Sequence, residues 1–386
     1  MNITSKSFNE LMFDKLTIEA VNSPTDLKIS SRLVSMPYDE ERGTPRAAPV
    51  STCSSQESVA TVHHPCVTSQ FVDIESHYLI DPTVLGVGHH GSVRQCIHRQ
   101  TGKQYAVKSV CKLGPNVKIQ GLVREIRLLQ EMKHKSIIQL VDVYEDVEYV
   151  HLVTELCRGG ELFEQIVEKS NSSGAGCFSE VESARLLQQI LQAVLYMQEL
   201  NIVHRDLKPE NILFTDKNKD SIKIIDYGLA RKHYANLGEP FMQTIAGTPY
   251  YIAPEILDKK YDNSCDMWSI GIIAYILLVG YPPFNGNNNN EVYAAVRKGT
   301  YSFPEEDWKH VSTEAQNFIV SLLQRDPLRR MTVAQALRHP WLLKNLPMME
   351  VDGSKDAVEV VYRKASRRDA VSFRGLFRPN VKIMHS

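Results

Sequence analysis

The sequence predicts an α+β fold, in which a small β-rich unit precedes a larger and mainly helical unit. Two observations lead to this expectation. Short β-like runs surround a single helical pattern in the first part of the chain, and helical periodicity dominates after about residue 156. The β-like runs cover 105–110 and 149–154, and the helical patterns cover 122–131, 180–200 and 269–279.

The composition is that of an ordinary soluble protein of 386 residues, with 43% hydrophobic and 23% charged residues. The net charge of −1 argues against a dedicated nucleic-acid binder. The 7 cysteines include no C-x-x-C pair, so we expect neither a disulfide framework nor a zinc ribbon. The most apolar stretch, 270–279, is shorter than the ~20 residues that span a bilayer, and the N-terminus does not resemble a signal peptide. We therefore expect a cytoplasmic protein without stable membrane insertion, and a nuclear location also agrees with these observations.

The two ends of the chain differ in composition from its centre. Residues 1–76 are rich in Ser, Thr and Pro and hold few large apolar side chains, so we expect a mostly disordered extension. Residues 343–386 form a tail that is polar and then basic. The polar stretches 170–176 and 287–290 are predicted to be surface loops.

A glycine-rich motif opens the compact part of the chain. Gly86, Gly88 and Gly91 form G-x-G-x-x-G, and Val93 follows two residues later. Glycines allow a backbone turn to approach phosphates closely and to offer its N–H groups to them. The next residues, 92–97, look like a strand and not a helix, which favours a β-hairpin over a nucleotide rather than a Rossmann turn. For this motif alone, a plain glycine-rich hairpin is the alternative.

A strand ending in an inward-facing lysine follows, as Tyr105-Ala-Val-Lys108. A buried ammonium needs a partner, and Glu125 lies 17 residues later in the helical pattern. A Lys108–Glu125 pair would hold the lysine against the phosphates of ATP. A surface lysine is the alternative reading of this tetrapeptide.

The motif that decides the sequence reading is His204-Arg-Asp-Leu-Lys-Pro-Glu-Asn211, followed by Asp226-Tyr-Gly228 and Ala253-Pro-Glu255. Phosphoryl transfer requires positioning and neutralised charge more than covalent chemistry. Asp206 can orient an attacking hydroxyl and accept its proton, and Lys208 can reach the γ-phosphate. Asn211 and Asp226 supply the hard oxygen ligands that Mg²⁺ prefers.

Through these motifs, the sequence resembles the eukaryotic serine/threonine protein kinases over about residues 78–342. The likeness is strongest to the calcium/calmodulin-dependent and calcium-dependent groups. It implies a bilobal kinase fold, with a small β-rich N-lobe with a regulatory helix (78–155) and a larger, mainly helical C-lobe (156–342). The further segments that carry it are Arg158-Gly-Gly-Glu-Leu-Phe163, 247–255, Gly280-Tyr-Pro-Pro-Phe284, 326–332 and His339-Pro-Trp341.

The resemblance implies ATP and Mg²⁺ as cofactors. Glu155 and Cys157 would meet the adenine through the backbone of the hinge, and Glu255 would pair with Arg330 to brace the activation segment. Asp206, Lys208, Lys108 and Glu125 would be catalytic. The residues expected to contact ATP are Leu85, Gly86, Val87, Gly88, His89, His90, Gly91, Ser92, Val93, Ala106, Lys108, Glu155, Cys157 and Leu213.

Two glutamates suggest the substrate preference. Glu161 and Glu210 match positions that, in basophilic kinases, contact a basic residue three before the acceptor, so we expect protein substrates with Arg-x-x-Ser/Thr. Thr248 is expected to contribute to substrate binding and, with Lys208, favours Ser/Thr over Tyr. The alternative is that both glutamates are solvated surface acids.

Regulation is expected at two places. Thr244 lies where related kinases carry an activating phosphate, which Arg205 could engage. The tail is basic and amphipathic, so it could bind calmodulin or be autoinhibitory, and Arg363-Lys-Ala-Ser366 fits the expected substrate pattern. A plain solvated tail is the alternative.

One departure from the family pattern is Tyr227, which replaces the usual phenylalanine and brings a hydroxyl that needs a partner. We expect activity to survive this change. A catalytically inactive pseudokinase scaffold is the main rival reading, but the core catalytic positions are all present. A small-molecule kinase of the same fold is a second rival.

Overall fold

The structure is a computed structural model of the chain. It describes residues 73–88, 91–113, 118–172, 178–234, 238–239 and 241–346. The expected loop histidines His89 and His90, the tail residue Ser366 and nearly all of the N-terminal extension lie outside these ranges.

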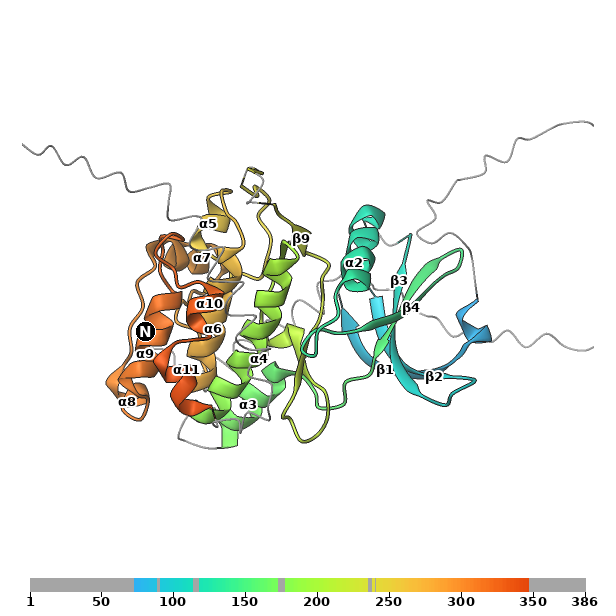
Figure 1. Cartoon of the computed structure of the whole chain (residues 1–386), viewed down its shortest axis with the longest axis horizontal. Helices are drawn as coiled ribbons and strands as arrows, with labels where there is room; N and C mark the ends of the chain where they lie inside the picture. Colours follow the sequence, from blue (N-terminus) through green and yellow to red (C-terminus); the bar gives the residue numbers. More distant parts are fainter. Residues whose placement is uncertain are drawn as a thin grey trace, which may run out of the picture. The chain divides into compact units, whose positions relative to one another are not determined.

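The N-lobe is a five-stranded antiparallel sheet with the strand order β1-β2-β3-β5-β4 (Figure 1). The glycine-rich motif lies at the turn of its first hairpin, where Gly88 pairs with Gly91. No helix follows the motif, so the expected β-hairpin is confirmed and the Rossmann alternative is excluded. The strands are β1 (Tyr78–Gly88), β2 (Gly91–His98), β3 (Gln104–Cys111), β4 (Leu140–Glu145) and β5 (Tyr149–Glu155).

A short 3-10 helix, η1 (Ile74–Ser76), packs with Tyr78 on the sheet. Ile74 is 5% exposed, and Arg99 on the β2–β3 turn donates from Nε to the carbonyl oxygen of Glu75 at 2.7 Å. Residues 73–76, which the sequence predicts to belong to a mostly disordered extension, are therefore structured, because Ile74 packs with Tyr78 on an apolar surface of the sheet. The small core formed here contains Ile74, Tyr78, Cys96, Val107 and Val153.

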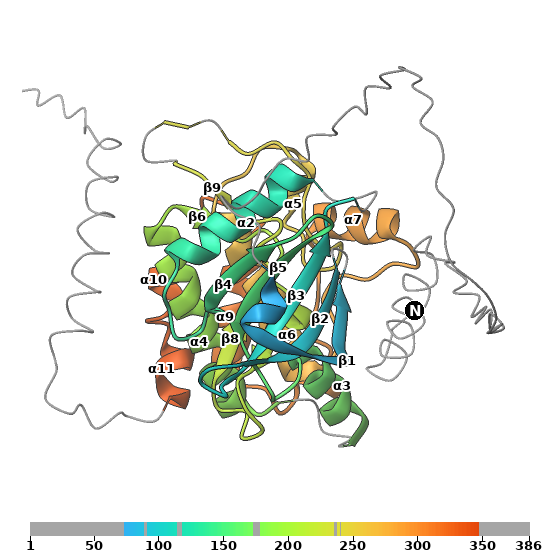
Figure 2. The ribbon, with the colours of Figure 1, turned by 90° about the vertical axis from the view of Figure 1, so that its right-hand side faces the viewer.

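Helix α2 (Ile119–Glu131) lies beside β4 (Figure 2). Its apolar residues recur at helical spacing and turn one face toward the sheet. Glu125 lies on this buried face, among Leu122, Ile126, Leu128 and Leu129. A carboxylate placed there needs a cationic partner, which makes the helix a way of positioning Glu125.

The C-lobe is built around α6 (Ser264–Val279), whose residues from Cys265 to Val279 are all buried. Helices α4 (Glu180–Glu199) and α9 (Thr313–Leu322) pack against it (Figure 1). Helix α4 begins with a capping box in which Ser179 and Glu182 satisfy each other's backbone N–H groups. The other helices described here are α3 (Leu162–Ser172), α5 (Pro254–Leu257), α7 (Asn289–Lys298), α8 (Glu305–Trp308), α10 (Val333–Ala336) and α11 (Pro340–Asn345).

Four short strands of the C-lobe flank the loops that carry the sequence motifs. Strands β7 (Ile212–Phe214) and β8 (Ile222–Ile224) form one hairpin, and β6 (Ile202–Val203) pairs with β9 (Arg231–Lys232). A 3-10 turn, η2 (Pro209–Asn211), precedes β7. The loops between these strands carry the residues of the decisive sequence motif.

Three expected boundaries differ from the structure. Asn289 and Asn290 form the first turn of α7 instead of a loop, because the Asn288 side chain accepts the N–H of Glu291 at 3.1 Å and caps the helix. Helix α3 continues to Ser172, into the stretch expected to be a loop. The tail was expected from residue 343, but α11 continues to Asn345.

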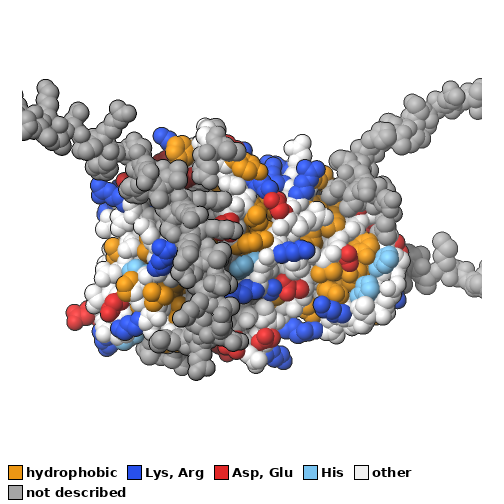
Figure 3. Space-filling view, viewed as in Figure 1, with side chains coloured by type: hydrophobic (Ala, Val, Ile, Leu, Met, Phe, Trp, Pro, Cys, Tyr) orange, Lys and Arg blue, Asp and Glu red, His pale blue; other side chains and the backbone are white. Residues whose placement is uncertain are grey.

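The surface shown in Figure 3 carries basic and acidic side chains interspersed over the described residues. This mixed pattern agrees with the near-zero net charge of the sequence. Among the helices that the structure describes, none has the length and apolar character needed to cross a membrane.

Candidate active site

Lys108 on β3 and Glu125 on α2 form the expected ion pair. The Lys108 Nζ atom lies 3.0 Å from Glu125 Oε1, and the Glu125 side chain is 7% exposed. Burial acts to lower the pKa of Lys108, but the charges of Glu125 and Asp226 outweigh it and raise that pKa. Lys108 is therefore cationic at neutral pH, and the ion pair with Glu125 fixes the position of its ammonium group.

Asp226 brings a second carboxylate to the same cation. Burial acts to raise its pKa, but the Lys108 charge and the Gly228 N–H group lower it overall, so Asp226 is ionised. Its backbone is left-handed, with φ of 60°, and Gly228 N donates to Oδ1 at 3.2 Å. The result is an ionised oxygen ligand beside Lys108.

Asp206 is the centre of a dense set of hydrogen bonds. The Thr248 hydroxyl and backbone N–H both donate to its Oδ1 atom, at 2.8 and 3.0 Å. Lys208 Nζ lies 3.3 Å from Oδ2 and donates to the Thr248 hydroxyl at 2.9 Å. Asn211 Nδ2 donates to Oδ2 at 3.2 Å and to the Asp206 carbonyl oxygen at 2.9 Å. The expected residues Asp206, Lys208, Asn211 and Thr248 therefore meet at one point.

Asp266 on α6 anchors the catalytic loop, here residues 204–211. Asp266 accepts the backbone N–H groups of His204 and Arg205, at 2.9 and 2.8 Å. Burial raises the pKa of Asp266, although His204 and these hydrogen bonds act in the opposite direction. Because residues 265–279 of α6 are all buried, these two hydrogen bonds attach the loop to the core of the C-lobe.

The residues that could hold Mg²⁺ fit that ion chemically. Asn211 offers an amide oxygen and Asp226 an ionised carboxylate, both hard ligands. The described residues contain no cluster of three or more His, Cys, Asp or Glu side chains that could hold a metal alone. This donor set is therefore suited to an ion whose remaining ligands are phosphate oxygens and water.

The glycine-rich hairpin closely approaches β3, the strand that carries Lys108. Gly91 has φ of +152°, and a Cβ atom there would lie 2.0 Å from the carbonyl oxygen of Ser109 on β3. Only glycine fits this approach, so the hairpin tip can fold down over the strand that carries Lys108. Ser92, Val93 and Ala106 are half-buried on β2 and β3, whereas Leu85 is 53% exposed.

The two residues expected at the hinge, Glu155 and Cys157, lie at and just after the end of β5. Glu155 ends β5, its Oε1 atom lies 2.7 Å from Lys223 Nζ, and it accepts the N–H of Gln139 at 2.8 Å. Cys157 is half-buried, and burial raises the pKa of its thiol to about 11. The side chain of Glu155 is thus used structurally, and its backbone N–H also donates to the carbonyl oxygen of Gln139 at 3.1 Å. Leu213 on β7 faces the segment that contains Glu161.

Glu210 is a half-buried acid, and one of its carboxylate oxygens is buried without a hydrogen-bond partner. Its Oε2 atom makes no hydrogen bond in the described structure. Burial raises its pKa to about 7, with Asp206 and Glu161 adding to the shift and Lys208 opposing it. Glu161 also has a raised pKa, first through burial and then through Glu164. Two half-buried carboxyl groups with raised pKa values therefore act on each other here, and Lys208 acts on both.

The activation segment, here residues 226–255, is folded against the catalytic loop. Gly247 has φ of +114°, and a Cβ atom there would lie 2.8 Å from the carbonyl oxygen of Arg205. This close approach places Thr248 against Asp206. Thr244 is exposed, and its carbonyl oxygen accepts a hydrogen bond from Tyr261 at 2.6 Å.

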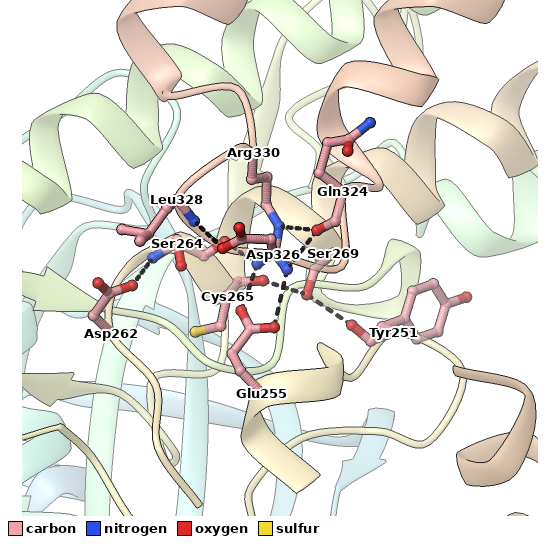
Figure 4. A network of polar contacts seen from close by, with 10 residues as sticks. All are labelled: Tyr251, Glu255, Asp262, Ser264, Cys265, Ser269, Gln324, Asp326, Leu328 and Arg330. Carbon is pink, nitrogen blue, oxygen red and sulfur yellow. Dashed lines mark hydrogen bonds and ion pairs between the residues drawn. The ribbon is translucent and has the colours of Figure 1, made fainter. Parts of the chain in front are cut away.

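The far end of the segment is clamped by a buried ion pair (Figure 4). Arg330 binds both carboxylate oxygens of Glu255, from Nη2 at 2.9 Å and from Nη1. It also donates to the carbonyl oxygens of Gln324 and Ser264, and its guanidinium lies 5.2 Å from the Trp268 ring. The pair expected from the sequence is confirmed.

Tyr227 packs edge-on against His204, with ring centroids 4.9 Å apart. It is 1% exposed, and its hydroxyl oxygen makes no hydrogen bond to the described residues. The ring therefore packs as a phenylalanine would, and the hydroxyl is an added buried polar group.

Comparison with known proteins decides the family. The model of the protein kinase domain matches residues 80–342. The chain belongs to the protein kinase family.

The kinase is similar to several curated protein kinases. It is 45% identical over 273 residues to calcium-dependent protein kinase 5 of Plasmodium berghei, an alignment that covers 70% of this chain and 47% of that protein. It is 40% identical over 301 residues to a probable myosin light chain kinase of Dictyostelium discoideum, covering 77% and 74%. It is 41% identical over 265 residues to calcium/calmodulin-dependent protein kinase type 1 of Caenorhabditis elegans, covering 68% and 73%. The kinase spans about half the length of the calcium-dependent relatives it matches first.

Two parts of the kinase site escaped the sequence reading. Tyr261 contacts the site from between two helices, and no local motif marks it. Lys232 on β9 donates to Glu131 at the end of α2 at 2.8 Å, which links that helix to the activation segment. A lysine and a glutamate 101 residues apart show no pairing in the sequence.

Proposed function

We propose that this chain is an ATP- and Mg²⁺-dependent serine/threonine protein kinase. The observation that carries the proposal is the meeting of Asp206, Lys208 and Thr248 at one point, 2.8 to 3.3 Å apart. A scaffold has no need for a carboxylate, an ammonium and a hydroxyl in this arrangement. The Lys108–Glu125 pair with Asp226 supports the same function at the phosphate end.

The proposal gives each group a task. Asp206 would orient the acceptor hydroxyl and take its proton as the bond to phosphorus forms. Lys208 and Lys108 are cations that can stabilise charge on the phosphoryl oxygens, and Glu125 fixes Lys108 in position. Bound Mg²⁺, held by Asn211 and Asp226, would supply neutralisation of the phosphate charge. The glycine-rich hairpin would exclude water from the phosphates.

The preferred substrate is proposed to carry arginine three residues before the acceptor. The unpartnered Oε2 atom of Glu210 supports this preference, because a buried acceptor gains most from a cationic donor. Glu161 contributes a second carboxylate at the same place. A hydrogen bond to a charged group is worth about 1.5–3 kcal/mol, which is roughly 10- to 150-fold in discrimination.

Regulation is proposed at the activation segment and at the tail. A phosphate on the exposed Thr244, whose carbonyl oxygen the Tyr261 hydroxyl already joins to Arg205, should raise activity. The basic tail, with Arg363-x-x-Ser366, is proposed as a pseudosubstrate or a self-phosphorylation site. Since some relatives are named calcium/calmodulin-dependent, Ca²⁺/calmodulin is the first effector to test.

The proposal is tested by the initial rate of ³²P transfer from MgATP to an Arg-x-x-Ser peptide. The rate is measured with chelator and then with Ca²⁺/calmodulin. If transfer requires Ca²⁺/calmodulin, control through the tail is supported. If transfer is equal under both conditions, calmodulin control is excluded and the proposed kinase activity is retained. A pseudokinase would bind partners and transfer nothing under either condition, even with phosphate on Thr244.

A further inference from the structure

Tyr261 joins the catalytic loop to the activation segment through a single hydroxyl group. It lies between α5 and α6, and is 1% exposed. Arg205 Nη1 donates to the hydroxyl at 3.0 Å, and the hydroxyl donates onward to the carbonyl oxygen of Thr244 at 2.6 Å. A phenol can accept and donate at once, which phenylalanine cannot. The hydroxyl therefore bridges a buried cation and the backbone of the segment.

The backbone beside this bridge holds the segment at a second point. Tyr261 and Met242 exchange backbone hydrogen bonds of 2.9 and 3.3 Å. The Lys260 ammonium lies 5.1 Å from the centre of the Phe241 ring. Residues 241–244 are thus attached to residues 260–261 by contacts from both backbone and side chains.

Arg205 is fixed at the other end of the bridge. Its N–H donates to Asp266, and its Nε atom donates to the carbonyl oxygen of Leu229 at 2.7 Å. Arg205 is 7% exposed, so its charge needs partners inside the protein. The Tyr261 hydroxyl is one such partner, and it serves without any phosphate.

Tyr261 lies between two helices that each carry a buried, hydrogen-bonded acidic residue. Helix α5 before it carries Glu255, clamped by Arg330 (Figure 4), and α6 after it carries Asp266. Burial raises the pKa of the Tyr261 hydroxyl, although Arg205 opposes this, so the hydroxyl keeps its proton at neutral pH. It can therefore donate to Thr244 throughout the physiological range.

We infer that Tyr261 is a positioning residue for phosphoryl transfer, and that its hydroxyl holds the activation segment in working geometry before a phosphate is attached to Thr244. The inference rests on the proposed kinase activity. Because the bridge uses the carbonyl oxygen of Thr244 and not its hydroxyl, it survives replacement of that side chain. A phosphate on Thr244 would then further stabilise an activation segment that already has this geometry.

The test compares Tyr261→Phe with Tyr275→Phe, both in the full chain carrying Thr244→Ala. Tyr275 is a matched control because it is 2% exposed, and its hydroxyl donates to the carbonyl oxygen of Ser302 at 3.0 Å, away from Arg205. We expect Tyr261→Phe to lower kcat about tenfold relative to Tyr275→Phe, the loss expected for one hydrogen bond to a charged group. The KM for ATP should change less than about twofold, since the hydroxyl bridges Arg205 and Thr244 and not the nucleotide site.

Hydrogen exchange of the amides in 241–247 provides a second readout that needs no catalysis. We expect faster exchange there in Tyr261→Phe and not in Tyr275→Phe. Equal kcat in the two variants, or equal exchange, would overturn the inference. So would a Thr244→Ala parent that transfers nothing while the Thr244-phosphorylated chain is active. If the wild-type chain transfers nothing in any state, the proposed function fails, and the exchange result still decides whether the bridge orders the segment.

Discussion

The ammonium of Lys108 on β3 lies 3.0 Å from the carboxylate of Glu125 on α2, and this pair sets the position of the helix relative to the sheet. Asp226, from the start of the activation segment, acts on the same ammonium and raises its pKa further. A Cβ atom on Gly228 would lie 3.5 Å from Glu125 Oε2, so the segment also approaches the pair through its backbone. Three elements that are separate in the sequence therefore depend on one cation.

Replacing Glu125 by Gln should lower kcat/KM for ATP by at least about tenfold. The loss of the carboxylate leaves Lys108 to be drawn toward Asp226, away from the phosphates, and a lost charge pair of this kind is worth about 1.5–3 kcal/mol. Steady-state kinetics with varied ATP measures the effect. Glu314→Gln, which removes an exposed surface pair with Lys344, is the control and should leave kcat/KM for ATP unchanged. An unchanged kcat/KM in Glu125→Gln would contradict the role given to the pair.

The Glu210 carboxyl should make recognition of arginine depend on pH. Its pKa is raised to about 7, so it is largely neutral at pH 6 and ionised at pH 8. The kcat/KM for an Arg-x-x-Ser peptide, which reports on the free enzyme, should therefore rise as pH increases through about 7. Glu210→Gln should be slower with this peptide and lose this rise. A peptide with alanine in place of arginine should show no such rise with wild type, and an identical profile for both peptides would rule out Glu210 as the reader of arginine.

The same carboxyl should lower stability at high pH. A carboxyl with a folded-state pKa above its ordinary value binds its proton more tightly when folded, so stability is lost as pH rises from about 4.5 through about 7. Glu210→Gln should then melt at a higher temperature than wild type at pH 8 and at a similar temperature at pH 4.5. Melting curves at the two pH values measure this. A difference of the same size at both pH values would argue against an ionisation effect.

Tyr227→Phe should stabilise the protein. The change removes a buried hydroxyl that makes no hydrogen bond to the described residues, and such a group costs about 1–3 kcal/mol. We expect Tm to rise by roughly 2–4 °C for each kcal/mol in a domain of this size. Tyr275→Phe, which removes a hydroxyl that is hydrogen-bonded, should lower Tm and serves as the control. A fall in Tm for Tyr227→Phe would mean that the hydroxyl has a partner, such as a buried water.

Breaking the Glu255–Arg330 pair should destabilise the C-lobe strongly. The Arg330 side chain is 0% exposed and that of Glu255 is 8% exposed. Glu255→Gln therefore leaves the buried Arg330 cation without a carboxylate partner. Removing one member of a buried pair costs about 3–5 kcal/mol. Denaturant unfolding of Glu255→Gln measures the loss in the free energy of unfolding, with the exposed variant Glu314→Gln as reference. A loss below about 1 kcal/mol would show that the Glu255–Arg330 pair contributes little to stability.

Residues joined by short spacings were predictable from the sequence. Asp206, Lys208 and Asn211 lie within one loop, so their types and order already indicated their chemistry. The hairpin at Gly88–Gly91 was predictable for the same reason, since the turn and both strands are local.

Features that depend on the tertiary fold were not predictable. The hydroxyl of Tyr261 reaches Arg205 across 56 positions of sequence. The pKa of Glu210 is raised by burial, and burial follows from packing that no motif records. The first turn of α7 was read as a loop because asparagine disfavours helices in isolation, whereas Asn288 in the folded chain acts as a cap.

The most direct test of kinase function is ³²P transfer from MgATP to an Arg-x-x-Ser peptide by wild type and by Asp206→Asn. Asn keeps the shape of the side chain but cannot take the proton of the acceptor hydroxyl. We predict steady transfer by wild type and a rate at least about 10²-fold lower in the variant, the contribution of a general base, with ATP binding retained. Equal rates in the two proteins, or no transfer by wild type even with Thr244 phosphorylated, would contradict the account.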